Sequence, residues 1–175
     1  MRATAVDGTK ESLSMSQRSD PDRLAQLQRL MVLDTQPEAD FDKLTAYLAS
    51  QLDVPIAMVN LLDEKRDWFK SCVGLPVSES PAALSFCQQV LVSDAPLILV
   101  EDTTLDVRYA EHPFVTGAPF IRFYAAARLC VAGQTVGTLC AYDVKPRQLK
   151  VSEVEALQLM ASAAVELLTR RSAAA

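Results

Sequence analysis

Two apolar runs joined by a tight turn constrain this chain more than any other segment. They extend over residues 121–143, and the turn between them contains Gly133. Runs rich in β-branched and aromatic residues around such a turn are typical of a β-hairpin. Because both runs are apolar at nearly every position, both faces of the hairpin are expected to be covered, which places it centrally in a sheet.

The turn also predicts a register. If Ala132 and Gly133 form the loop, Val131 faces Gln134, and Arg122 lies opposite Asp143 further along the hairpin. Opposite charges in such a cross-strand pair stabilise a sheet by roughly 0.2–1 kcal/mol. A shift of one residue would break this pairing.

The same register sorts the hairpin side chains between the two faces of the sheet. It places Tyr142 and Cys140 on the face that carries Phe123 and Ala125. Cys140 then faces Ala125 and not Cys130. No pair of cysteines is therefore expected to meet within the hairpin.

The rest of the chain is predicted to supply helices and further strands. Asp20 is expected to cap the first helix, and capping boxes are expected at Thr35–Glu38 and Ser152–Glu155. Hairpin-joined strands with helices at both ends indicate an α+β fold with an antiparallel sheet. The predicted elements are helices at 20–33 and 35–52, strands at 54–62 and 67–73, a short helix at 85–91, a strand at 96–100, a long connection at 101–117, the hairpin and a final helix from 152.

The domain boundaries follow from the apolar periodicity. Residues 1–19 show none and are expected to be disordered. One domain is predicted over residues 20–171, with a short tail at 172–175.

Charge and hydropathy limit the partners and the compartment. The net charge is −5 and the pI is about 4.9, which disfavours nonspecific nucleic-acid binding and attachment to anionic membranes. No apolar run approaches the ~20 residues of a membrane span, and the N-terminus lacks the apolar core of a signal peptide. A cytoplasmic location with four reduced cysteines is therefore expected.

Several common chemistries have no motif in this chain. The five glycines form neither a dinucleotide fingerprint nor a phosphate-binding loop, and the single histidine, His112, excludes a two-histidine zinc motif. The spacing of Cys72, Cys87, Cys130 and Cys140 fits neither a zinc knuckle nor a redox pair. No metal site is predicted, and no metal, haem or nucleotide cofactor is indicated.

Several segments, in this order, carry a resemblance to a known family. They are Leu33–Asp42, Asp67–Ser71 with Gly74-Leu75, Ser85–Cys87, Asp106–Ala110, Pro113–Gly117, Ile121–Ala125 and Gly137–Cys140 with Asp143. With the order of elements, they resemble a GAF domain, a small-molecule sensory module of bacterial signalling proteins. The similarity is to the subgroup found at the N-terminus of sensor histidine kinases and diguanylate cyclases, which also occurs as free-standing domains.

The resemblance implies an antiparallel sheet of five or six strands. The N-terminal and C-terminal helices would cover one face, and the short helix near Ser85 with the long loop would close a pocket over the other. It also implies frequent homodimers through the terminal helices. The ligand in such pockets varies between subgroups, because GAF domains share a fold far more than a ligand.

The chain departs from the family pattern at several positions. Gln89 stands where the subgroup has a histidine, and Ala126 and Arg128 replace a glycine and a proline of the penultimate strand. The motif of the cyclic-nucleotide class and the adjacent cysteine and histidine of bilin attachment are not found. The clustered cysteines of the free methionine sulfoxide reductases, which are also GAF proteins, are not reproduced either.

The first functional hypothesis is a non-catalytic module that senses an unidentified small molecule. Arg122 could hold an anionic ligand, or could pair internally with Asp143 or Asp102. Trp68 could equally be a core residue. The expected pocket residues are Trp68, Phe86, Cys87, Asp102, Tyr109, Phe114, Arg122 and Tyr124.

Two alternatives stay open. One is a thiol enzyme of the methionine sulfoxide reductase type with Cys87 as nucleophile, although the sequence indicates neither a base nor a nearby resolving cysteine. The other is a ligand-free dimerisation or protein-interaction module that acts on a separate signalling protein. The residues expected at its helix–helix seam are Leu24, Leu27, Val154, Leu157, Ala161, Ala164 and Leu168.

Overall fold

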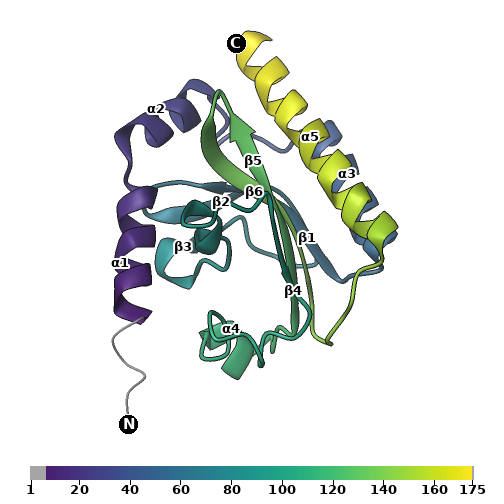
Figure 1. Cartoon of the computed structure of the whole chain (residues 1–175). Coiled ribbons are helices and arrows are strands. Elements are labelled where there is room, and N and C mark those ends of the chain that lie inside the picture. The colour runs from purple at the N-terminus through teal and green to yellow at the C-terminus, as the bar shows by residue number, and fades with distance from the viewer. Residues whose placement is uncertain (1–6, 175) are drawn as a thin grey trace.

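A computed structural model describes residues 7–174 of the chain. Figure 1 shows a central sheet with α3 and α5 along one side and α1 on the other. The elements in chain order are α1 (Asp7–Arg18), α2 (Pro21–Arg29), α3 (Ala39–Leu52), β1 (Ile56–Leu62), β2 (Arg66–Val73), β3 (Glu79–Pro81), the 3₁₀ helices η1 (Ala82–Leu84) and η2 (Cys87–Leu91), β4 (Leu97–Val100), α4 (Pro113–Thr116), β5 (Phe123–Val131), β6 (Gln134–Asp143) and α5 (Val151–Ala174).

The sheet is antiparallel and has six strands in the order β3-β2-β1-β6-β5-β4. This confirms the predicted α+β class and the central position of the β5–β6 hairpin. β3 was not predicted, because three residues of mixed polarity carry no strand pattern. It forms an edge by pairing with the first residues of β2.

Two apolar cores lie on the two faces of the sheet. Three side chains pack against the first face and are at most 1% exposed: Leu27 of α2, Phe41 of α3 and Leu157 of α5. Burying each such side chain contributes roughly 1.5–3 kcal/mol. The predicted cover of this face by the N-terminal and C-terminal helices is thus confirmed. The second face packs against η2, the long loop and α4.

The predicted register of the hairpin is wrong over most of its length. The loop is as expected, since Val131 pairs with Gln134, but a β-bulge follows at once. Leu129 pairs with Gly137, so β6 contributes one extra residue, and Phe123 rather than Arg122 lies opposite Asp143. A bulge adds a residue to one strand and reverses the alternation of side chains beyond it.

The bulge moves Cys140 and Tyr142 to the second face of the sheet. They pair there with Ala126 and Tyr124. The expected contact of Cys140 with Ala125 is therefore wrong.

Gly137 sits at this bulge because two strands approach closely there. A Cβ atom at this position would lie 2.1 Å from the carbonyl oxygen of Asn60 in β1. No side chain fits at that distance, which is the usual reason for a glycine inside a strand.

The helix starts follow only one of the three predicted caps. Asp20 caps α2 by accepting a hydrogen bond from the Arg23 amide at 2.8 Å, as predicted. The box at Thr35–Glu38 is wrong, because α3 begins after Glu38, which caps nothing. The Thr35 hydroxyl and the Glu38 carboxylate instead accept hydrogen bonds from the buried Lys70 ammonium, at 2.9 and 2.7 Å.

The last helix begins one residue before the predicted cap. α5 starts at Val151, and the Glu153 carboxylate accepts a hydrogen bond from the Lys150 amide at 2.7 Å. The box at Ser152 and Glu155 is therefore wrong.

Both ends of the described chain are more ordered than predicted. α1 occupies most of residues 1–19, and the part of that prediction that falls on residues 1–6 lies outside the described residues. Arg18 is fully buried against the second face of the sheet. α5 continues to Ala174, so the predicted tail at 172–175 is helical up to there.

Candidate functional site

An apolar cavity of about 350 Å³ lies on the second face of the sheet. Its walls come from β1, β2, β3 and β6, from η1 and from the segments around α4. The lining residues are Ile56, Met58, Asp67, Phe69, Leu75, Val77, Glu79, Ser80, Pro81, Leu84, Phe86, Phe114, Pro119, Ile121 and Tyr142. None of these described residues is Lys, Arg or His, so an anionic ligand would find no cationic side chain on the walls.

Aromatic side chains fill the neighbouring part of the same face. Phe86 stacks on Tyr109 with ring centroids 5.0 Å apart, and Tyr124 lies 5.0 Å from Tyr142. The Tyr109 hydroxyl donates a hydrogen bond to the Phe86 carbonyl at 3.2 Å. Burial raises the pKa of Tyr109, Tyr124 and Tyr142 far above the ordinary value for tyrosine, so all three stay neutral hydrogen-bond donors.

The Cys87 thiol lies beneath this aromatic cluster. It is fully buried and accepts hydrogen bonds from the Tyr124 hydroxyl at 2.9 Å and from the Thr138 hydroxyl at 3.0 Å. The Cys140 Sγ lies 3.7 Å from the Cys87 Sγ, and the Tyr142 hydroxyl lies 3.6 Å from it. The two sulfur atoms are in direct contact, although both thiols are free.

The two thiols differ in acidity. Burial raises the pKa of the Cys87 thiol, and the charge of Asp67 adds to that effect. The hydrogen bond between Cys87 and Cys140 and the hydroxyl groups of Thr138 and Tyr124, which donate to the Cys87 sulfur, outweigh both and leave the pKa of Cys87 below the ordinary thiol value. Burial and the neighbouring Cys87 raise the pKa of Cys140. The arrangement therefore favours a negative charge on Cys87 rather than on Cys140.

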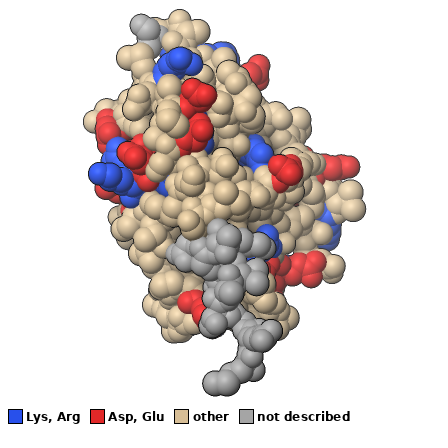
Figure 2. All heavy atoms as spheres, turned by 60° about the vertical axis from the view of Figure 1, so that its left-hand side comes forward, with Lys and Arg blue, Asp and Glu red and all other residues tan. Residues whose placement is uncertain are grey.

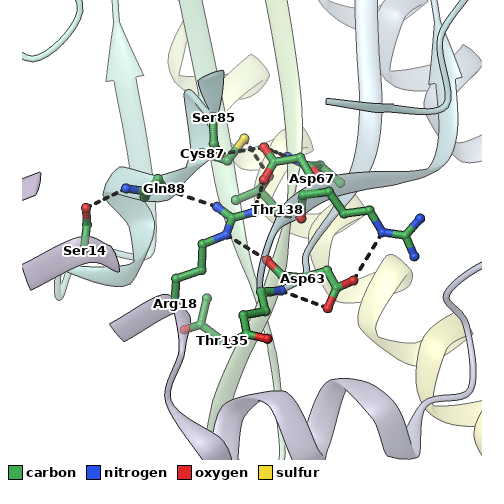
Figure 3. Close-up of polar contacts among 12 residues, drawn as sticks. Ser14, Arg18, Asp63, Asp67, Ser85, Cys87, Gln88, Thr135 and Thr138 are labelled. Atoms are coloured by element: carbon green, nitrogen blue, oxygen red, sulfur yellow. Dashed lines mark hydrogen bonds and ion pairs between the residues drawn. The ribbon is translucent and has the colours of Figure 1, made fainter. Parts of the chain in front are cut away.

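A buried ion pair joins the N-terminal helix to the cavity wall (Figure 3). The Arg18 guanidinium at the end of α1 pairs with the Asp67 carboxylate of β2. It also donates to the Asp63 carbonyl at 2.7 Å, to the Arg66 carbonyl at 2.8 Å and to the Gln88 side chain at 3.3 Å. A fully buried cation is stable only when its donors are used in this way.

Asp67 connects this network to the cavity. Its second oxygen accepts hydrogen bonds from the Asn60 amide at 2.9 Å and from the Ser85 hydroxyl at 2.6 Å, while the residue lines the cavity. Figure 3 shows Ser85 and Cys87 beside this carboxylate, whereas Gln88 bonds to Arg18 and Ser14 of α1. One carboxylate thus touches the cavity, the segment between η1 and η2, and α1.

Only some of the eight expected pocket residues lie at the cavity. Phe86 and Phe114 line the cavity. Cys87, Tyr109 and Tyr124 lie behind it in the buried aromatic and thiol cluster.

The other three expected pocket residues lie elsewhere. Trp68 points to the first face and packs in the helix-covered core. Asp102 accepts hydrogen bonds within its own turn, from the amide and hydroxyl of Thr104. Arg122 donates to the carbonyls of Val115 and Ile121, so neither predicted side-chain pair of this arginine forms.

Three central residues of this site were missed by the sequence reasoning. Arg18 falls in the segment assigned to disorder, where an amphipathic pattern is absent. The predicted register places Cys140 on the wrong face, because no sequence pattern predicts the bulge. Asp67 begins the strand predicted at 67–73, and a charged residue in that position is the signal that could have identified it.

The expected dimer seam belongs to the core of the single chain. Leu27, Leu157, Ala161, Ala164 and Leu168 are buried between the helices and the first face of the sheet. These five side chains cannot also pack against a second molecule, so their placement at a dimer seam is wrong. Leu24 and Val154 are half-buried.

Two structural searches of the described residues are negative. None of the described helices is long and apolar enough to span a membrane. Within residues 7–174, no three His, Cys, Asp or Glu side chains gather as metal ligands do.

Sequence comparison identifies the family. The GAF domain family model matches residues 36–167. A cyclic di-GMP phosphodiesterase of Pseudomonas aeruginosa is 36% identical over 126 residues, which are 71% of this chain and 21% of that protein. The chain thus spans about a fifth of the length of this curated relative.

Solved structures share the fold at low sequence identity. The GAF domain of an Acinetobacter phosphoenolpyruvate-protein phosphotransferase superposes with a TM-score of 0.65 at 16% identity, over 89% of this chain and 98% of that one. A free methionine-R-sulfoxide reductase from Neisseria meningitidis reaches 0.64 at 14% identity, over 100% and 97% of the two chains. At such identities the likeness shows the fold alone. Domains of the GAF family typically serve as sensory modules in signalling proteins. The family model and the shared fold together establish that this chain belongs to the GAF domain family.

Proposed function

We propose that this GAF domain is a non-catalytic sensor that binds a small molecule in the cavity beside Asp67. The observation that carries the proposal is the cavity itself: about 350 Å³ of apolar space next to a network that reaches the N-terminal helix. Pockets of this size with a few convergent polar groups are typical ligand sites. The proposed compartment is the cytoplasm, where the free thiols stay reduced.

The chemistry of the walls favours an uncharged or cationic ligand with an aromatic or aliphatic body. The polar lining residues are Asp67, Glu79 and Ser80, and two of them are carboxylates. Arg18 and Arg66 pair with these carboxylates but do not line the cavity, so the phosphates of a nucleotide would meet two acidic groups and no free cation on the walls, which is unfavourable in a low-dielectric site. Cyclic di-GMP, the substrate in the name of the curated relative, is therefore not the proposed ligand.

Native mass spectrometry of the purified protein is the first test. If the native protein is heavier than the 19.1 kDa chain and the excess disappears on denaturation, the excess gives the mass of a bound molecule. Thermal-shift assays with indole, benzamidine and cyclic di-GMP then compare a neutral, a cationic and an anionic probe. We expect stabilisation by at least one of the first two and none by cyclic di-GMP.

Two matched variants locate the binding site. Val77 lies at the cavity and is half exposed, so Val77→Trp should block the space without disturbing the core. Val107 is 93% exposed and outside the cavity, so Val107→Trp is the control. Loss of probe binding in the first variant alone supports the proposal, whereas equal binding in both variants contradicts it.

A second candidate is a ligand-independent interaction module. It is favoured by the aromatic cluster, in which Phe86, Tyr109, Tyr124 and Tyr142 occupy space that a ligand could otherwise use. Homodimerisation stays a proposal and has to use surface other than the buried seam residues. Leu159 of α5 is 74% exposed, so dissociation of a dimer by Leu159→Glu in light-scattering measurements would support this candidate.

The charges on the outer surface bear on the class of partner. Figure 2 shows the side of the molecule that carries α1, where acidic and basic side chains are interspersed among larger uncharged areas. The net charge of −5 favours a protein partner over a nucleic acid or an anionic membrane. A separate signalling protein is the partner we propose.

A further inference from the structure

We propose that Cys87 and Cys140 form a reversible disulfide on exposure to hydrogen peroxide, which makes this domain a thiol switch independent of the proposed ligand. The observation is the contact between two free, fully buried thiols from distant segments, with their Sγ atoms 3.7 Å apart. The sequence alone indicates no resolving cysteine for Cys87. The bulge in the hairpin supplies one by bringing Cys140 to the second face.

The geometry requires a small movement. A disulfide joins its sulfurs at about 2.05 Å, so the two atoms have to approach by roughly 1.7 Å. Cys140 is held in β6 between two paired strands, whereas Cys87 opens η2, a short 3₁₀ helix at the edge of the long loops. We therefore expect η2, rather than β6, to make most of the movement.

The surroundings prepare Cys87 to react first. The Tyr124 and Thr138 hydroxyls donate to its sulfur at 2.9 and 3.0 Å, and such donors stabilise a thiolate. Cys140 faces the carbonyl of Met58 at 3.8 Å, an acceptor that favours its protonated form. One thiol is thus arranged as the attacking group and the other as the resolving group.

The chemistry balances with hydrogen peroxide as the named oxidant. Cys87 gives up its proton, its thiolate attacks one peroxide oxygen, the O–O bond breaks, and Cys87 becomes a sulfenic acid while the leaving hydroxide takes up that proton to form water. The Cys140 sulfur then attacks the Cys87 sulfur and displaces its hydroxyl, which takes up the Cys140 proton to leave as a second water. Two thiols and one peroxide give one disulfide and two waters.

The cavity offers the oxidant a route. Tyr142 lines the cavity, and its hydroxyl lies 3.6 Å from the Cys87 sulfur and 3.7 Å from the Cys140 sulfur. Peroxide is little larger than water, and Tyr142 touches both the cavity and the two sulfurs. Phe86, the residue before Cys87, lines the same wall.

Oxidation has a path to the N-terminal helix. Gln88 follows Cys87 in η2 and contacts both Ser14 and Arg18 of α1. A shift of η2 toward β6 pulls these contacts away from α1. The disulfide also removes the thiolate acceptor of the Tyr124 hydroxyl. We therefore expect faster amide hydrogen exchange in α1 after oxidation.

The test uses a variant that keeps only the proposed pair. Cys130 is exposed and Cys72 is half-buried, so Cys72→Ser/Cys130→Ser removes the other thiols with little effect on the core. After peroxide treatment, thiol titration should lose both remaining thiols, and the intact mass should fall by two hydrogen atoms. Peptide mapping should identify a Cys87–Cys140 link that dithiothreitol reverses.

Further measurements make the result decisive. Cys140→Ser in the same background should trap a dimedone-reactive sulfenic acid at Cys87 and lose the link. Peptide mapping of the oxidised wild-type chain gives the same answer if the double variant fails to fold. The proposal is wrong if peroxide oxidises Cys130 in the wild type while the Cys87–Cys140 link stays undetected, or if α1 exchange is unchanged by the link. Probe binding at the cavity is measured separately, so the two proposals fail independently.

Discussion

Replacing Arg18 by methionine tests whether one buried ion pair holds the N-terminal helix to the domain. The Arg18 side chain is 0% exposed and the Asp67 side chain 5% exposed, so water screens neither charge. Methionine keeps much of the length and removes the cation. The Asp67 carboxylate then keeps only the donors on its second oxygen, from Asn60 and Ser85.

The magnitude follows from this loss. Removing one partner of a buried pair costs about 3–5 kcal/mol, because the remaining charge stays buried without compensation. Unfolding free energies of single domains are roughly 5–15 kcal/mol, so Arg18→Met should cost a large share of the total stability. Asp67→Asn should cost a similar amount for the same reason. The double variant should cost less than the sum, because neither charge is left alone.

Urea unfolding at pH 7 measures these differences. Trp68 is the single tryptophan and lies in the core of the first face, so its fluorescence reports global unfolding. Arg29→Met is the control, because Arg29 is exposed and its loss should change stability by less than about 0.5 kcal/mol. A cost below about 1 kcal/mol for Arg18→Met, as for an exposed pair, would refute the reasoning. Strict additivity in the double variant would refute it as well.

Three further predictions use other parts of the fold. Gly137→Ala should lower the melting temperature strongly, because its Cβ would overlap the Asn60 carbonyl at 2.1 Å. Gly133→Asn should lower it much less, because a Cβ there meets nothing within 4 Å and asparagine is among the residues that best tolerate the positive φ of +79°. Lys70→Met should also destabilise in urea unfolding, since its buried ammonium serves three acceptors in the segment before α3. Burial lowers the pKa of His112, so the unfolded chain takes up the proton first. Stability should therefore fall below about pH 6.5, and His112→Asn should flatten that part of a melting-temperature profile; an unchanged profile would contradict this.

The hairpin shows how far sequence patterns reach. The apolar runs and the Ala132-Gly133 turn predicted both the hairpin and its loop correctly. The bulge beside the loop then exchanged the faces of Cys140 and Tyr142. At the bulge, Gly137 of β6 packs closely against Asn60 of β1, which is a contact between segments far apart in the sequence.

The sequence by itself determined the α+β class, the order of most elements, the two-faced character of the sheet and the family. These features depend on local periodicity, turn residues and short motifs, which a single chain displays directly. The tertiary structure decided which residues form the candidate site. Arg18 is buried because Asp67 lies opposite it, and Cys87 meets Cys140 because a bulge turns the strand. Burial and charge pairing are properties of two segments at once, so neither segment reveals them alone.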